Sequence, residues 1–303
     1  MAIDKQRLAQ YCASGRKQVH GWLNPVDAEL FRQILLLQDS LGIRGGAAEI
    51  GVHHGKSFIP LCLGLHDNER AVCVDIFEDQ THNVDLSGQG SREKLERNLQ
   101  RFSVPADRVV VLKASSFDVS AKHIVDAVGS VRFFSVDGGH WRDIVVDDLG
   151  IAGDAVGERG VIALDDFLHK EWPDVTRGFF DWHRGPGADF APLAISPNKL
   201  YLVRKESFGV YAEQLFAIPS LRSRILKYYN FLGQRVPILS QRCPYFVLAL
   251  KNRAPAFMKG CWPSSAAVSE GLDRRFALAG ATPVTRKHRR NTGKTFHSAP
   301  RLG

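Results

Sequence analysis

Short apolar runs alternate with helical patterns over the middle of this chain, and that alternation limits the folds it can adopt. Five runs are typical of strands, and the amphipathic segments between them are typical of helices. The expected strands are Ala47–Val52, Ala71–Phe77, Val109–Leu112, Val131–Val136 and Gly160–Leu164, and the expected helices are Lys56–Leu65, Arg92–Phe102, Ala121–Val128 and Trp141–Val156. Strands joined through helices at this spacing form βαβ crossovers. The pattern therefore predicts an α/β fold with a mostly parallel sheet and helices on both faces.

Further elements are expected on either side of this region. Leu193–Ser196 and Leu200–Arg204 are separated by a short turn, so they predict an antiparallel hairpin at the end of the sheet. A short helix is expected at Lys5–Cys12. Asn24 and Pro25 fit the cap and the first turn of a longer helix that runs to about residue 41.

The basic character of the chain is concentrated at its C-terminal end. The whole sequence has a net charge of +8, which is typical of proteins that bind nucleic acids or anionic membranes. Residues 1–250 hold 29 Lys and Arg against 30 Asp and Glu, whereas residues 251–303 hold 11 against 2. We therefore expect a nearly neutral body and a basic, disordered tail, and nucleic acid is not the expected partner of the body.

Changes of pattern divide the chain into four expected parts. They are an N-terminal helical segment at 1–44, the sheet domain at 45–205, an appended helical or apolar element at 206–250, and the tail at 251–303. The first and third parts offer surfaces for a homo-oligomer. No apolar run is long enough to span a membrane, and the N-terminus lacks a signal-peptide core. The five cysteines form no CxxC pair, which favours a reducing compartment, so we expect a cytoplasmic protein.

The first strand ends in a glycine-containing turn that is typical of a ligand site. Glu49, Gly51 and Gly55 form a Glu-x-Gly-x-x-x-Gly segment where the strand passes into a helix. Asp75 ends the second strand, 24 residues after Gly51, where a βαβ unit places an acid for ribose hydroxyls. These residues predict an adenosine-containing ligand. An acid beside the turn would repel a phosphate but could pair with an amine, which favours S-adenosylmethionine (SAM) over a dinucleotide. A generic turn is the alternative.

Carboxylates follow the fourth and fifth strands, at Asp137 and at Asp165 and Asp166. The carboxyl ends of parallel strands share one edge of a sheet, so these side chains are expected to converge beside the glycine turn. Carboxylates so close require a cation, and oxygen ligands favour Mg²⁺, with Mn²⁺ or Ca²⁺ as alternatives. His140 is a candidate proton acceptor on the same loop. The alternatives are that Asp137 caps the following helix and that His140 contacts backbone.

These features in combination resemble the class I SAM-dependent methyltransferases, and within them the metal-dependent sugar O-methyltransferases of the macrocin and aminocoumarin type. Val136–His140 matches a Val/Ile-Asp-Gly-x-His segment, and Leu164–Asp166 carries the Asp-Asp pair of that branch. The resemblance covers residues 25–205 and implies a Rossmann-like sheet. It also implies SAM at Glu49, Gly51, Gly55 and Asp75, adenine near Ser116, Phe117 and Asp118, a divalent metal on Asp137, Asp165 and Asp166, and His140 or Asp137 near the proton to be removed.

The activity implied by this resemblance is methyl transfer from SAM to a hydroxyl of a small molecule, with a sugar hydroxyl as one candidate. Three alternatives stay open: a metal-independent methyltransferase with another O- or N-acceptor, an NAD-type oxidoreductase, which the glycine spacing disfavours, and RNA binding through the tail. The loop at 78–90 departs from the family pattern and is either a lid, a substrate contact or a solvated connector. The aromatic residues Trp172, Phe179, Phe180 and Trp182 are candidates for an acceptor pocket or for the buried face of a helix.

Overall fold

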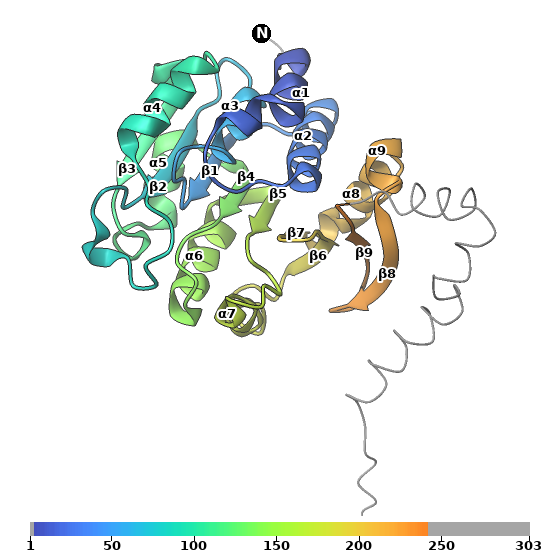
Figure 1. The fold of residues 1–303 in the computed structure, drawn as a ribbon. Coiled ribbons are helices and arrows are strands. Elements are labelled where there is room, and N and C mark those ends of the chain that lie inside the picture. Colours follow the sequence, from blue (N-terminus) through green and yellow to red (C-terminus); the bar gives the residue numbers. More distant parts are fainter. Residues whose placement is uncertain (1–2, 242–303) are drawn as a thin grey trace, which may run out of the picture. The chain divides into compact units, whose positions relative to one another are not determined.

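A nine-stranded sheet runs through residues 3–241, the part of the chain that the computed structural model describes. The strands are β1 (Gly46–Ile50), β2 (Ala71–Asp75), β3 (Val109–Lys113), β4 (Val131–Val136), β5 (Val156–Leu164), β6 (Phe190–Ile195), β7 (Leu200–Arg204), β8 (Ile225–Phe231) and β9 (Gln234–Leu239). Their order is β3-β2-β1-β4-β5-β7-β6-β9-β8 (Figure 1). Strands β1 to β5 pair in parallel, and β7 pairs antiparallel with β5 and β6. The predicted sheet and its hairpin are confirmed. The tail at 251–303 lies outside the described residues.

Helices cover both faces of the sheet, as predicted (Figure 1). One face packs against α1 (Lys5–Ala13), α2 (Pro25–Ser40), α3 (Phe58–Leu63), α4 (Arg92–Arg101), α8 (Phe208–Leu215) and α9 (Pro219–Arg222), and the other against α5 (Ala121–Val128), α6 (Arg142–Ala155) and α7 (Pro173–His183). Strands covered on both sides have no polar face, which explains the nearly continuous apolar runs. Within residues 3–241, every helix is too short or too polar to cross a membrane.

Local chemistry explains where several elements begin. The Asn24 side chain accepts hydrogen bonds from the backbone N–H groups of Val26 and Asp27, at 2.9 and 3.0 Å, and so caps α2 as predicted. The third helix starts later than predicted, at Phe58, because the turn after β1 continues through Ser57. Strand β5 starts four residues earlier than predicted, since an exposed polar stretch at Glu158 and Arg159 interrupts its apolar pattern.

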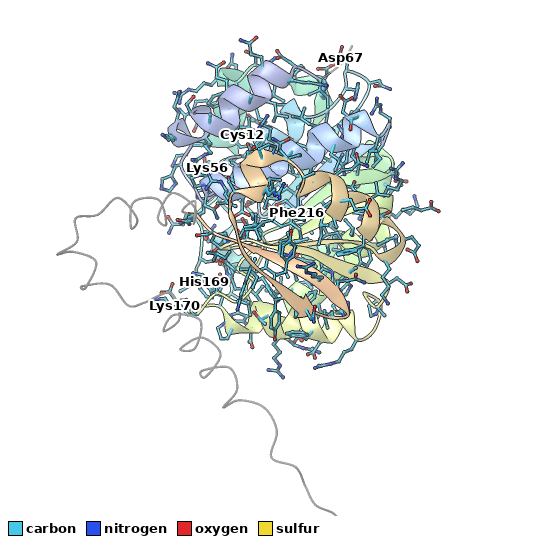
Figure 2. The ribbon with its side chains drawn as sticks, turned by 90° about the vertical axis from the view of Figure 1, so that its right-hand side faces the viewer. Cys12, Lys56, Asp67, His169, Lys170 and Phe216 are labelled. Atoms are coloured by element: carbon cyan, nitrogen blue, oxygen red, sulfur yellow. The ribbon has the colours of Figure 1, made fainter. Side chains whose placement is uncertain are left out.

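The segment after β7 adds more than the expected helical or apolar element. Helices α8 and α9 lead into the β8–β9 hairpin, and Ile238 of β9 pairs in parallel with Ile195 of β6. Phe216, which follows α8, is buried in the core (Figure 2). The sequence did not predict these strands, because β8 exposes apolar residues such as Leu226 and Tyr229 and so lacks a clear alternation.

The order of the strands reverses between β1 and β4, and ligands bind at such a switch point in open α/β sheets. There the turn after β1 passes very close to the end of β4. Gly51 has a φ of +80°, and a Cβ atom on it would lie 1.7 Å from the backbone oxygen of Asp137. The backbone N–H of Asp137 in turn donates to Ile50 at 2.9 Å. A glycine is therefore required at position 51 for two independent reasons.

We predict that Gly51→Ala destabilises the fold by more than about 3 kcal/mol, since it adds a backbone clash to the strain of a positive φ. Gly42→Ala is the matched control. Gly42 also has a positive φ, +66°, but a Cβ atom on it would meet no other atom within 4 Å. The control should lose about 1 kcal/mol. Urea denaturation measures both, and equal losses would contradict the role of the Asp137 contact.

Candidate functional site

A cavity of about 540 Å³ opens at the carboxyl ends of the central strands, a size typical of small-molecule sites. Most of the predicted site residues line it: Gly51, Asp75, Ser116, Asp137, His140, Asp165 and Asp166. Three others do not. Glu49 and Gly55 lie behind the wall, and Asp118 is exposed outside it. The structure thus joins the predicted SAM side and the predicted acidic side in one cavity.

Asp75 lies at the end of β2 on one side of the cavity. Its carboxylate accepts hydrogen bonds from the backbone N–H groups of His53, at 2.7 Å, and Phe77, at 2.5 Å. Burial raises the pKa of this carboxyl above its usual value. A Cβ atom on Gly90 would lie 2.8 Å from the Asp75 Oδ1 atom, so the end of the 78–90 loop rests against this acid. A carboxylate has about four lone-pair sites, which leaves capacity for a ribose hydroxyl.

Glu49 is fully buried at the end of β1. The hydroxyls of Ser57 and Ser135 face its carboxyl, but among residues 3–241 neither carboxyl oxygen has a well-formed hydrogen bond. Burial raises the pKa of Glu49 to about 8. The Ser57 hydroxyl and the Lys199 charge lower this pKa, but their effects are smaller than that of burial. The carboxyl therefore holds its proton at neutral pH.

The acidic side of the cavity brings together Asp137, His140 and Asp166. One ligand atom from each of these side chains lies within 4.8 Å of the others. The His140 Nε2 atom is 3.0 Å from the Asp166 Oδ2 atom. Helix α6 is preceded by Trp141 without a side-chain cap, so Asp137 does not cap it. The predicted convergence is present, with His140 closer to the centre of the cluster than Asp165.

Lys199 lies in the hairpin turn between β6 and β7 and pairs with the predicted acids, a contact that was not predicted from the sequence. Its side chain is 2% exposed, and its Nζ atom lies 3.0 Å from Asp165 and 3.9 Å from Asp137. Burial alone would raise the pKa of Asp165, but the Lys199 charge lowers it, whereas burial and the charge of Asp165 raise the pKa of Asp137. The sequence contains an indication of this ion pair. A lysine between two buried strands at the carboxyl edge of a sheet requires a carboxylate partner.

Asp85 is a second missed residue, and it joins the 78–90 loop to the acidic side. Its Oδ2 atom lies 2.7 Å from Nδ1 of His140 and accepts from the His140 backbone N–H at 2.9 Å. Burial would lower the pKa of His140, but Asp166 and Asp85 together raise it to about 10. The imidazole therefore carries a proton at neutral pH in this arrangement. The loop contacts the site and is more than a solvated connector.

The aromatic residues after β5 divide between the cavity and the core. Trp172 lines the cavity and stacks on His140, with ring centroids 4.2 Å apart and an angle of 15° between the planes. Phe179 and Trp182 are buried in α7, and Phe180 packs against them half-buried. His169 also lines the cavity and is labelled in Figure 2. The interpretation as the buried face of a helix is confirmed for Phe179 and Trp182, and the acceptor pocket stays a prediction for Trp172.

We predict that Glu49 makes the stability of the ligand-free protein fall between pH 5 and pH 8. The unfolded chain loses the Glu49 proton near pH 4.3, whereas the folded chain keeps it up to about pH 8, so folding is progressively penalised in this window. Glu49→Gln should remove this dependence, which amounts to about 3 kcal/mol. Denaturation of both proteins across this range measures the difference. Parallel pH profiles would show that Glu49 is already ionised.

We predict that Lys199→Met destabilises the protein by about 3–5 kcal/mol, because it leaves Asp165 buried without its cation. The double variant Lys199→Met/Asp165→Asn should recover part of the loss, since it removes the stranded charge as well. Lys5→Met is the control, because Lys5 is 63% exposed and its ion pair is solvated. Additive effects of the two changes in a double-mutant cycle would contradict the coupling.

Comparisons with known proteins relate this chain to one protein family and to several solved structures. Residues 48–167 match a protein family described as a methyltransferase domain. The O-methyltransferase NovP has a similar structure, with a TM-score of 0.50 and 16% identity, over 58% of this chain and 78% of that one. The O-methyltransferase TomG from Streptomyces achromogenes, solved in complex with SAM, has a TM-score of 0.45 and 16% identity, over 67% of this chain and 90% of that one. No curated protein matches the sequence.

The matched region holds the chemistry of the cavity. It runs from Ala48 in β1 to Phe167 after β5, and so includes Gly51, Asp75 and the three acids of the opposite side. The similarity to NovP supports the same fold for the sheet around it. Residues 48–167 of this chain therefore match a methyltransferase domain, and the sheet around the cavity has a fold similar to that of NovP.

Proposed function

We propose that this enzyme transfers the methyl group of SAM to a hydroxyl of a small molecule, with a divalent cation on the acidic side of the cavity. The observation that carries this proposal is the continuity of the cavity. A turn suited to SAM, at Gly51 and Asp75, and an acidic cluster suited to a hydroxyl acceptor, at Asp137 and Asp166, share one space of about 540 Å³.

The SAM side is assigned to Gly51, Asp75 and Ser116, which line the cavity. Asp75 binds the ribose hydroxyls in this proposal, and the segment at Ser116 and Phe117 faces the adenine. Gly55 does not line the cavity but allows the turn to pack against α4. A Cβ atom on it would lie 2.6 Å from the side chain of Leu95 and would displace the turn. Glu49 supports the same turn in its protonated form. Asp118 does not line the cavity, so the structure does not support the prediction that it binds SAM.

The residues of the acidic side fit a divalent cation. Asp137 and Asp166 supply carboxylate oxygens, the ligands that Mg²⁺ prefers, and His140 is within reach of both. Asp165 contributes less directly, since it already binds Lys199 and accepts from Asn198 at 2.5 Å. A cation bound here would lower the pKa of an acceptor hydroxyl and orient it.

The protein groups around the cation site bind and orient the acceptor. Asp137 is a ligand of the cation in this proposal, and without a cation its burial and the nearby Asp165 charge raise its pKa. His140 is fixed between Asp85 and Asp166 and must give up its own proton before it can act as a base. Trp172 offers a flat apolar wall beside these polar groups. Polar groups next to an aromatic face suit an acceptor such as a sugar, which has both hydroxyls and an apolar face, and NovP is likewise described as an O-methyltransferase.

A metal-independent methyltransferase is the second candidate, and one observation favours it. Lys199 already pairs with Asp165, and protonated His140 already pairs with Asp166, so protein cations balance two of the three acids. In that case Asp137 would act as the base without a cation, and the acids would bind acceptor hydroxyls or amines directly.

We predict that Asp166→Asn lowers methyl transfer by at least about 100-fold while SAM affinity changes by less than about threefold, because Asp166 lies on the acidic side and away from Asp75. Excess chelator should have the same effect on the native enzyme, and added Mg²⁺ should reverse it. The measurements are turnover with a panel of hydroxylated acceptors and calorimetry with SAM.

Asp107→Asn is the control, since Asp107 is exposed in the connection before β3. It should leave both quantities unchanged. Full turnover in chelator would select the metal-independent candidate. Loss of SAM binding in Asp166→Asn would contradict the division of the cavity into two sides.

A further inference from the structure

Three histidines from two separate segments meet beside the cavity, away from the acidic cluster. His20 precedes α2, and His53 and His54 belong to the turn after β1. One ring nitrogen from each lies within 4.8 Å of the other two. The His20 ring centroid is 5.4 Å from those of both His53 and His54. His53 and Trp22 also line the cavity, so this group, the histidine cluster, stands at its edge.

Two ring nitrogens of the histidine cluster are buried and unsatisfied. Nδ1 of His53 and Nε2 of His54 are covered by protein, and within residues 3–241 they have no hydrogen-bond partner. His54 is 4% exposed, so solvent reaches little of its ring. Buried polar atoms without a partner are uncommon and costly, so a group that binds both nitrogens would stabilise the turn.

We propose that His20, His53 and His54 form a binding site for a transition-metal ion such as Zn²⁺. Three imidazoles with an open fourth position are an established zinc ligand set. The cluster supplies nitrogen where the acidic cluster supplies mainly oxygen, so the two sites select different metals: imidazole suits Zn²⁺, Cu²⁺ and Ni²⁺, and carboxylate suits Mg²⁺.

The surrounding contacts hold most of this site in place before any metal binds. The backbone N–H of His53 donates to Asp75 at 2.7 Å, and Lys56, labelled in Figure 2, donates to the Gly21 carbonyl at 2.7 Å. Zinc–nitrogen bonds of about 2.0–2.1 Å place ligand atoms about 3.4 Å apart. The exposed His20 side chain can adjust to this spacing, whereas His53 and His54 are held on the turn after β1. Burial lowers the pKa of the His53 and His54 rings, and the positive charge of Lys94 lowers it further, which favours the neutral imidazoles that bind metal.

A metal at the histidine cluster would connect the N-terminal segment to the turn that carries Gly51. Trp22 lies two residues after His20 and is 66% exposed, and its ring centroid is 5.5 Å from that of His53. An ion bound to the histidine cluster would therefore also fix the position of Trp22 at the cavity edge. This inference depends neither on the methyl acceptor nor on a cation at Asp166.

The test is Zn²⁺ calorimetry on the full-length, chelator-treated chain, with thermal unfolding and Cu²⁺ electron paramagnetic resonance. His20→Ala should weaken one Zn²⁺-binding event at least about 10-fold, remove the zinc-dependent rise in Tm, and reduce the number of nitrogens coupled to Cu²⁺ by one. His20 is exposed, so the metal-free Tm should stay the same and confirm that the variant folds.

Two controls make the result specific to the histidine cluster. His123→Ala removes another exposed histidine, at the start of α5, and should bind Zn²⁺ like the native chain. Asp166→Asn should also keep the Zn²⁺ site. Equal Zn²⁺ binding by His20→Ala and the native chain would overturn the proposal, and so would loss of the site in Asp166→Asn with retention in His20→Ala.

Discussion

The acids at the carboxyl edge of this sheet depend on the buried ammonium group of Lys199. A lysine that is 2% exposed requires negative partners, and here the partners come from the ends of β4 and β5. Asp27, buried on α2, also contributes to the potential at this lysine and receives a hydrogen bond from Tyr201 of β7 at 2.7 Å. One cation thus connects a covering helix, the hairpin turn and the carboxyl edge of the sheet.

The three aspartates at this edge have different surroundings as a result of this arrangement. Asp165 is committed to the protein interior, where it faces Lys199 and Asn198, and it is only 6% exposed. Asp137 lies 3.9 Å from the same lysine, and its burial and the charge of Asp165 raise its pKa. Asp166 has a φ of +53°, a conformation that turns its side chain away from Asp165 and toward His140. Neighbouring aspartates in the sequence therefore have different environments.

Sequence patterns predicted the parts of this enzyme that depend on local order along the chain. The parallel strands, the Asn24 cap and the convergence of Asp137 with Asp166 follow from periodicity and from the geometry of βαβ units. Lys199 and Asp85 were missed because their importance arises from contacts between segments 34 to 55 residues apart. Strand β8 was missed for a related reason: its exposed apolar face gives no clear pattern, and it joins the sheet through β9, which pairs with β6.

The 78–90 segment touches both halves of the cavity at once. Its Gly90 end rests on the acid expected to hold the ribose, and its Asp85 binds the histidine beside the acceptor acids. If SAM binds at Asp75 as proposed, a movement of this segment away from Asp75 would also break the Asp85–His140 ion pair. Binding of the cofactor and assembly of the acidic side would then be coupled through this one segment, and the proposed acceptor would meet a complete site only after the segment had closed.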